Sequence, residues 1–191
     1  MRLSIAENVA VRALSHPGRI AIEVLDGGAT LTYGQVWCRV TALAEALSAA
    51  KAGRHGRMVA LLLPNEADAV LAYLACQLAG VAAVPISTRL AEPEVTFVVE
   101  DSDAKLILTG GAFADLAGKV AASHGAQVVR VEDIETPDRV PRPLLGEAGR
   151  GAEPCVVGYT SGTTGFPKGA LYSNDHYLTA LMRWGWEFGL T

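Results

Sequence analysis

The stretch MVALLLPNEADAVLAYLACQLAGVAAVPI, residues 58–86, decides the fold. Its two ends, Met58–Leu63 and Ala82–Ile86, are short apolar runs that predict buried strands. Between them, Glu66–Ala79 has the length and composition of a helix, and Asn65 is expected to cap its start. Two buried strands joined by a helix are typical of parallel strands in an α/β sheet.

The same stretch is apolar enough to be considered as a membrane span, because Gln77 is its main polar interruption between residues 69 and 86. Gly80 and Pro85 break the run. Glycine favours the end of a helix, so we interpret the stretch as a buried helix followed by a buried strand. No membrane span is expected.

Helices and strands are expected to alternate on both sides of this stretch. Ser4 with Glu7, and Thr32 with Gln35, are capping boxes that predict the starts of two helices. The other expected elements are a helix end before His16-Pro17, a hairpin with strands at 20–25 and 29–31, helices at 33–50, 93–99 and 113–123, and strands at 106–109 and 127–131. This order predicts an α/β fold with a parallel-rich sheet flanked by helices.

The chain is expected to divide into three parts. Residues 1–135 form an α/β subdomain, and residues 136–154 form a loop or linker because they are rich in Pro, Gly, Arg and Glu without periodicity. Residues 155–191 contain a strand at 155–159, a glycine-rich loop and a helix that begins near Asn174. We interpret this last part as the start of the next subdomain.

Composition excludes several classes of protein. Half of the 191 residues are hydrophobic, and the net charge of −4 argues against a nucleic-acid partner, which usually requires a basic face. The three cysteines are far apart among apolar neighbours, which predicts buried thiols rather than disulfides. No cluster of His, Cys and acidic residues predicts a metal site. The N-terminus lacks a secretory pattern, so a cytoplasmic protein is expected.

The segment YTSGTTGFPKGA, residues 159–170, carries the chemistry. Its three glycines let backbone N–H groups turn inward, its four Ser and Thr hydroxyls can donate hydrogen bonds, and Lys168 adds a positive charge. Together they predict a phosphate-binding loop. A Walker-type loop requires Gly-Lys-Ser/Thr, whereas this chain has Pro167-Lys168-Gly169, so that type is excluded.

Residues 159–170 resemble the signature phosphate loop of the adenylate-forming superfamily, which includes acyl-CoA synthetases, aryl-CoA ligases, luciferases and nonribosomal adenylation domains. Two upstream segments, residues 78–86 with their Val84-Pro85 pair and residues 31–35, resemble further elements of the family. The resemblance covers the chain as the N-terminal portion of such an enzyme, within its large N-terminal domain. Among the members, acyl-CoA synthetases for fatty or related carboxylic acids are the most similar.

The resemblance implies that a carboxylate attacks the α-phosphate of ATP to give acyl-AMP and pyrophosphate, and that CoA then displaces AMP. Mg²⁺ would arrive with ATP. The resemblance implies that Gly165 and Gly169 act as hinges, and it assigns no catalytic residue within this chain. The nucleotide-binding residues that it implies are Thr160, Ser161, Gly162, Thr163, Thr164, Gly165 and Lys168.

The chain departs from the family at Asn174, which stands where members usually have a histidine. His176 is expected to be a helix-start or surface residue. Trp184 and Trp186 are expected to pack against whatever follows them. The family's later elements, which contact ribose and magnesium and supply a catalytic lysine, lie beyond residue 191, so we expect this chain alone to be inactive and its partner to be the missing C-terminal part.

Two alternatives remain open. The chain could be a truncated, non-catalytic module that binds nucleotide or another protein. It could also be an unrelated doubly wound nucleotide-binding domain, although no Gly-x-Gly-x-x-Gly turn follows the first long strand. The sequence leaves open the acyl substrate, its chain length and the oligomeric state.

Overall fold

The computed structural model describes residues 4–25, 28–50, 58–141, 152–160 and 167–189. The first two long helices begin where their sequences predict. Helix α1 (Ile5–Ser15) starts at Ser4, whose Oγ accepts a hydrogen bond from Glu7 N while the Glu7 carboxylate accepts one from Ser4 N. Helix α2 (Tyr33–Ala49) has the same reciprocal cap between Thr32 and Gln35. Both capping boxes are therefore confirmed.

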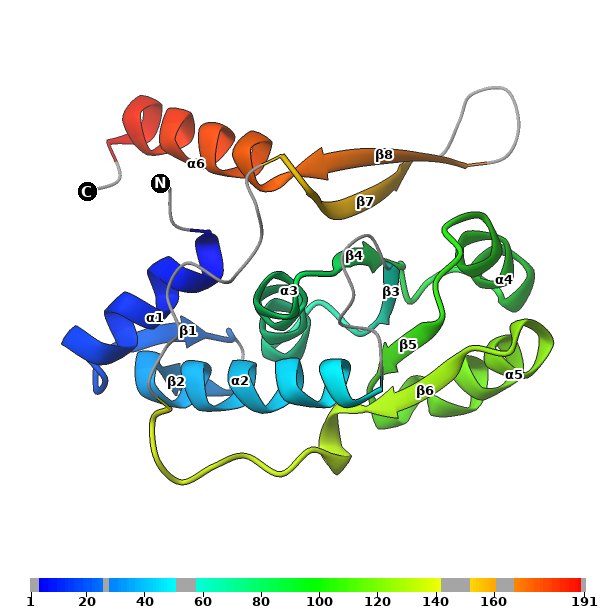
Figure 1. The fold of residues 1–191 in the computed structure, drawn as a ribbon, viewed down its shortest axis with the longest axis horizontal. Coiled ribbons are helices and arrows are strands. Elements are labelled where there is room, and N and C mark those ends of the chain that lie inside the picture. Colours follow the sequence, from blue (N-terminus) through cyan, green and yellow to red (C-terminus); the bar gives the residue numbers. More distant parts are fainter. Residues whose placement is uncertain (1–3, 26–27, 51–57, 142–151, 161–166, 190–191) are drawn as a thin grey trace.

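Six strands form the main sheet, in the order β6-β5-β3-β4-β7-β8 (Figure 1). Neighbours run parallel from β6 to β7, and only the last pair, β7 with β8, is antiparallel. The predicted α/β fold with a parallel-rich sheet is confirmed. The strands are β3 (Met58–Leu62), β4 (Ala82–Pro85), β5 (Leu106–Thr109), β6 (Gln127–Arg130), β7 (Pro154–Thr160) and β8 (Lys168–Ser173).

A separate two-stranded sheet precedes the main one. Strands β1 (Ile20–Glu23) and β2 (Thr30–Thr32) pair antiparallel, as the predicted hairpin requires. Short 3₁₀ turns at Gly111–Phe113 and Val131–Asp133 follow β5 and β6.

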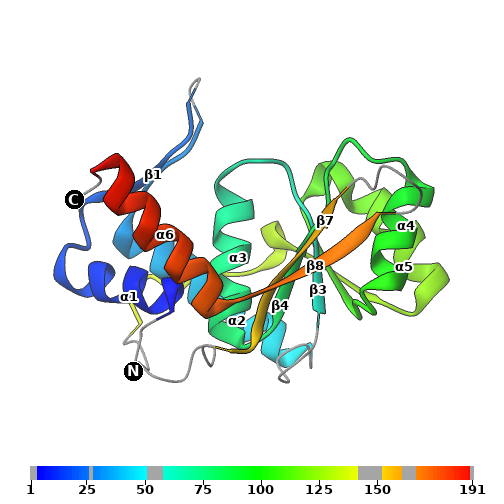
Figure 2. The same ribbon diagram turned by 90° about the horizontal axis from the view of Figure 1, so that it is seen from above.

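Helices cover both faces of the main sheet (Figure 2). Val59 and Leu61 of β3 pack in the cluster that also contains α1, α2 and α3 (Ala67–Ala79). Ala60 and Leu62 point to the other face, into the cluster of α4 (Glu92–Asp101) and α5 (Ala114–His124). Alternate residues of one strand are thus buried on opposite faces, which is why parallel strands have continuous apolar sequences.

The start of α3 differs from the prediction. Its N-cap is Glu66, which makes no side-chain capping hydrogen bond, so Asn65 does not cap the helix. Glu66 N donates to Pro64 O at 2.8 Å, and this tight turn places Asn65 one residue before the N-cap. At the other end, Gly80 adopts φ 68° in the left-handed region and ends the helix as predicted.

Strand β7 belongs to the same sheet as β3 to β6, so residues 155–160 pack on the preceding part of the chain. The proposed division at residues 136–154 stays a prediction. Cys38, Cys76 and Cys155 are free and buried, as expected. Over the described ranges, no helix is both long enough and apolar enough to cross a membrane.

Helix α6 (Asn174–Phe188) follows β8 and ends the described chain (Figure 1). Asn174 is its only buried residue. Trp184 is 58% exposed and Trp186 is 89% exposed. Several other large apolar side chains of β8 and α6 are also exposed: Leu171, Tyr172, Leu181, Met182 and Phe188. We call these seven residues the β8–α6 apolar face.

Candidate functional site

The predicted phosphate loop is flanked by β7 and β8. Thr160 ends β7, Lys168 begins β8, and the two residues are paired across the antiparallel ladder. Both are exposed. Ser161, Gly162, Thr163, Thr164 and Gly165, the other predicted nucleotide-binding residues, lie outside the described residues, so their role stays a prediction, as does that of Thr160 and Lys168.

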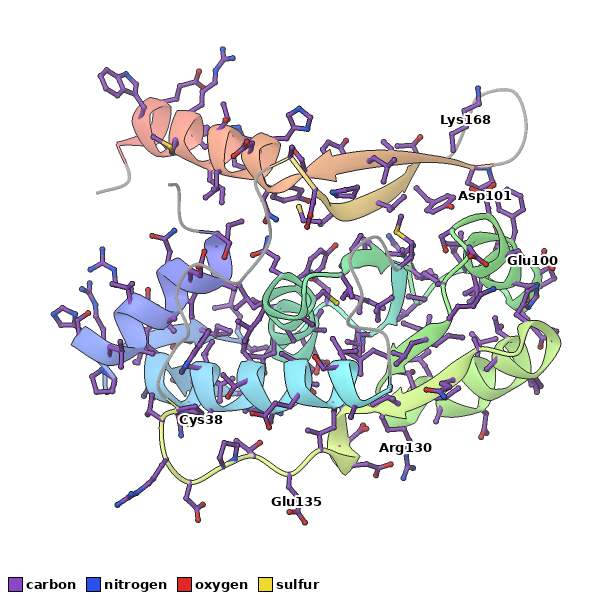
Figure 3. All side chains as sticks on the ribbon, in the orientation of Figure 1. Cys38, Glu100, Asp101, Arg130, Glu135 and Lys168 are labelled. Carbon is purple, nitrogen blue, oxygen red and sulfur yellow. The ribbon has the colours of Figure 1, made fainter. Side chains whose placement is uncertain are left out.

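The Lys168 ammonium is available to an anion. In the part of the chain that the structure describes, it has no carboxylate within ion-pair distance and no hydrogen-bond acceptor. Figure 3 shows its side chain extending from the start of β8. An exposed cation beside a chain segment rich in glycine and hydroxyls is suited to a polyphosphate.

The loop leaves the sheet from β7, one strand away from a topological switch point between β3 and β4. Because β3, β4 and β7 are parallel, their carboxyl ends lie at one edge of the sheet, and Thr160 lies at this edge. From there β3 connects to α3 on one face, while β4 connects to α4 on the other. Diverging connections of this kind open a crevice, which is where open α/β sheets bind ligands.

A groove of about 480 Å³ occupies this crevice. Polar groups from both diverging connections meet in it: Asn65 from the end of β3, and Ser87, Thr88 and Arg89 from the end of β4. Arg89 is exposed and, among the described residues, has no ion pair. The apolar and aromatic walls are Leu61, Leu63, Ala69, Tyr73, Pro85 and Ile86. The groove can therefore hold an organic ligand with an anionic group.

Sequence reasoning did not identify this groove. Its lining comes from two segments that are separated by α3, and only the parallel pairing of β3 with β4 brings them together. The available signal is that polar residues follow both apolar strands directly. Burial, with smaller effects from Tyr177 and the thiols of Cys76 and Cys155, raises the pKa of the Tyr73 phenol to about 12. Tyr73 is therefore protonated near neutral pH and does not serve as a base.

The departure at Asn174 lies far from the phosphate loop. Ser173, the preceding residue, is paired with Pro154 at the opposite end of β7 from Thr160. Thr160 lies six residues after Pro154 along the strand, which is about 20 Å at 3.3 Å per residue. Asn174 is 4% exposed, and its Oδ1 finds no hydrogen-bond partner in the described structure.

His176 is a helix-start residue, as predicted. Its backbone N donates to Ser173 Oγ at 3.3 Å, and its Nδ1 accepts from Ser173 N at 3.4 Å. This reciprocal pair is a capping box at the start of α6. Because the imidazole takes part in the cap at the distant end of β8, it does not lie at the phosphate loop.

A second cavity, of about 540 Å³, lies between the start of α2 and residues 136–140. It does not offer reactive groups. The Arg39 guanidinium is paired with Asp68 at 2.9 Å, and burial together with the Asp138 charge raises the pKa of the Cys38 thiol, which disfavours the nucleophilic thiolate. Across the described ranges, no group of three or more His, Cys, Asp or Glu residues is placed to hold a metal ion.

Residues 9–190 match the family of AMP-binding enzymes. The chain therefore belongs to this family. It is 31% identical, over 81% of its length, to the long-chain-fatty-acid–CoA ligase FadD13 of Mycobacterium tuberculosis. It is 34% identical, over 82% and 89% of its length, to the feruloyl-CoA synthase of an Amycolatopsis species and the 2-succinylbenzoate–CoA ligase of Bacillus subtilis.

The solved structures support the same relationship. The o-succinylbenzoate CoA synthetase of Bacillus subtilis, in complex with its acyl-adenylate intermediate, superposes with a TM-score of 0.77 at 32% identity over 96% of this chain. A protein from Rhodopseudomonas palustris, described as a candidate long-chain-fatty-acid CoA ligase, gives 0.80 at 26% identity over 98% of this chain. The chain spans about a third of the three curated relatives, between 31% and 34% of their lengths. These three relatives are thus CoA ligases that are longer than this chain.

Proposed function

We propose that this chain is the N-terminal part of an ATP-dependent acyl-CoA synthetase. The whole enzyme activates a carboxylic acid to acyl-AMP with release of pyrophosphate, then forms a thioester with CoA. The observation that carries the proposal is the position of Thr160 and Lys168, paired on either side of residues 161–166 at the switch-point edge of the sheet. Membership of the AMP-binding family supports it.

The substrate is proposed to be a fatty or related carboxylic acid. The names of the relatives support this class, because they include ligases for long-chain fatty acids, ferulic acid and succinylbenzoate. All three acids join a carboxylate to an apolar or aromatic body. The groove at the switch point, with apolar walls and one cation, has the corresponding chemistry.

Lys168 is proposed to stabilise the departing pyrophosphate. Negative charge accumulates on the β- and γ-phosphates as the carboxylate displaces them, and a preplaced ammonium favours that charge distribution. Thr160 can donate its hydroxyl to the same phosphates, and Ser161, Gly162, Thr163, Thr164 and Gly165 would complete the cradle. Mg²⁺ would enter bound to ATP and neutralise part of the phosphate charge.

The remainder of the enzyme is proposed to cover the β8–α6 apolar face. Helix α6 has 15 residues, which is marginal for a helix without a packing partner. Strand β8 is the last in the sheet, so its outer edge carries unpaired backbone groups. The greater length of the relatives supplies a polypeptide that could bury both.

The same exposed face also supports the second candidate function, a non-catalytic module that binds nucleotide or a partner protein. The two candidates differ in whether adding the C-terminal part restores chemistry. In the first case the completed chain releases pyrophosphate, and in the second it does not.

The test is ATP-dependent pyrophosphate release over short, medium and long fatty acids and aromatic acids. It compares this chain with one extended through the same gene, each with Lys168→Ala and with Lys119→Ala as a control for charge removed from an exposed position on α5. We expect activity only in the extended chain, a loss of about 100-fold for Lys168→Ala, and no change for Lys119→Ala. An extended chain that is inactive on every acid, or indifferent to Lys168, would refute the proposal.

A further inference from the structure

A hydrogen bond joins α4 to a stem of the phosphate loop, by which we mean the end of β7 or the start of β8 beside residues 161–166. Tyr159 Oη donates to Asp101 Oδ2 at 2.6 Å, although the two residues are 58 positions apart. Tyr159 is the residue before Thr160, and Asp101 is the last residue of α4. In Figure 3, Asp101 lies below the start of β8, where Lys168 is labelled. A short hydrogen bond to a carboxylate is of the stronger, charge-assisted kind.

The end of β7 needs contacts besides those with β4, because β7 extends past the end of that strand. β7 pairs with β4 at one position, Val156 with Ala83. Strand β4 ends two residues later, at Pro85, whereas β7 continues four residues to Thr160, about 13 Å at 3.3 Å per residue. Beyond Val156, β7 is held by its antiparallel partner β8, by the packing of Val157 and Tyr159 in the cluster of α4 and α5, and by the Tyr159–Asp101 hydrogen bond.

The same tyrosine also contacts the other stem. Tyr159 is paired with Gly169, and a Cβ built on Gly169 would lie 3.1 Å from Tyr159 Cζ and 3.3 Å from its Oη. The ring therefore lies against the backbone of β8 at Gly169, where there is no side chain. Gly169 has no positive φ, so the close approach of this ring accounts for the glycine. Its predicted hinge role remains a prediction.

We propose that Tyr159, held by Asp101, is a positioning residue that keeps Thr160 opposite Lys168 and so sets the mouth of the phosphate loop. This inference rests on the proposed function, because it assigns the mouth to ATP. The phenol remains a donor at neutral pH, since burial and the hydrogen bond to Asp101 both raise the pKa of Tyr159. The interaction of α4 with the loop stem thereby orients the two described residues that are predicted to bind phosphate.

Tyr159→Phe and Asp101→Ala test the proposal, since each removes one partner of the hydrogen bond, with Tyr172→Phe as the matched control. Tyr172 lies in the same hairpin and contacts the ring of Tyr177 edge-on at 5.8 Å between centroids, and no carboxylate among the described residues bonds its hydroxyl. The first measurement is amide hydrogen exchange on this 191-residue chain. Hydrogen-bonded and non-hydrogen-bonded pairs alternate along an antiparallel ladder, so only one of the pairs Tyr159–Gly169 and Thr160–Lys168 exchanges N–H···O bonds. We expect faster exchange at the two amides of that hydrogen-bonded pair in both test variants and no change in Tyr172→Phe.

The second measurement is pyrophosphate release by the extended chain. We expect the KM for ATP to rise about fivefold in each test variant, as for loss of one solvent-accessible hydrogen bond to a charged group, while the KM for the acid is unchanged. The double variant should be no worse than either single one, because both remove the same interaction. A purely structural role would instead lower the amount of folded enzyme and leave the KM for ATP unchanged.

Two results would overturn the inference. Unchanged exchange at the hydrogen-bonded amides of the two pairs would mean that the Tyr159–Asp101 hydrogen bond does not hold the stem. Faster exchange with an unaltered KM for ATP, in an enzyme that still depends on Lys168, would remove the positioning role alone. If the extended chain is indifferent to Lys168→Ala, the proposed function itself fails and the positioning role with it, whereas the exchange result still decides whether the hydrogen bond orders the hairpin.

Discussion

Replacing Gly169 by alanine should destabilise the chain, because the added methyl group has no room. Its Cβ would lie 3.0 Å from Val157 Cγ1 and 3.1 Å from Tyr159 Cζ, closer than ordinary van der Waals contact. Overpacking of this kind costs about 1–3 kcal/mol. The Tyr159 ring cannot simply swing away, since Asp101 holds its hydroxyl at 2.6 Å. Alanine loses less backbone entropy than glycine on folding, which offsets about 0.5–1 kcal/mol.

The net loss should be about 1 kcal/mol, which corresponds to a fall in Tm of about 2–4 °C for a chain of this size. Thermal and urea denaturation of the two chains measure it. Gly118→Ala is the matched control, because a Cβ there meets nothing within 4 Å and the residue lies inside α5. That substitution should stabilise the chain by about 0.5–1 kcal/mol.

Repeating Gly169→Ala in a chain that lacks the Tyr159 ring tests whether that ring causes the loss of stability. In a Tyr159→Ala chain, the penalty of Gly169→Ala should shrink but not vanish, because Val157 Cγ1 remains 3.0 Å from the new methyl. If Gly169→Ala is as stable as the wild type, or if Tyr159→Ala leaves its cost unaltered, the packing of this ring against β8 is not what the structure indicates.

Two further outcomes are expected. The hydrogen bond to Glu100 raises the pKa of His124, so protonated His124 stabilises the α5–α4 contact at pH values below the ordinary histidine pKa, about 6.5. This contribution is lost as the pH rises through the higher pKa of the folded state. Tm measured from pH 5.5 to 8.5 should show the loss in the wild type and not in Glu100→Gln. Arg89→Ala in the extended enzyme should raise the KM of the substrate whose anionic group binds in the switch-point groove about tenfold, at unchanged kcat, because the side chain supplies binding rather than chemistry. If the wild type and Arg89→Ala have equal KM values for ATP, acid and CoA, this role is excluded.

Local signals account for most of the elements that the sequence predicts. The capping boxes at Ser4 and Thr32 and the left-handed glycine at Gly80 act within one or two turns of chain, so the neighbouring residues suffice to predict them. The apolar run at Leu106–Thr109 is the strand that the structure contains, because burial on both faces requires an unbroken apolar sequence. The phosphate loop is likewise recognisable from its glycines, hydroxyls and lysine.

Other features depend on contacts that no local pattern contains. Strand β8 is absent from the predicted elements because Lys168–Ser173 is mostly exposed and becomes a strand by pairing with β7. Asn65 resembles a cap in sequence, yet the turn at Pro64–Glu66 places it in the groove instead.

The amino-acid sequence by itself determined the alternation of helices and strands, the loop chemistry and the family, since each of these is written in neighbouring residues. Tertiary structure alone decided which distant residues meet. Arg89 shares a groove with Asn65 because β3 pairs with β4, and Tyr159 reaches Asp101 because β7 lies beside the strand that leads into α4. The order of the strands determines these contacts, and that order depends on burying the whole sheet between its two layers of helices.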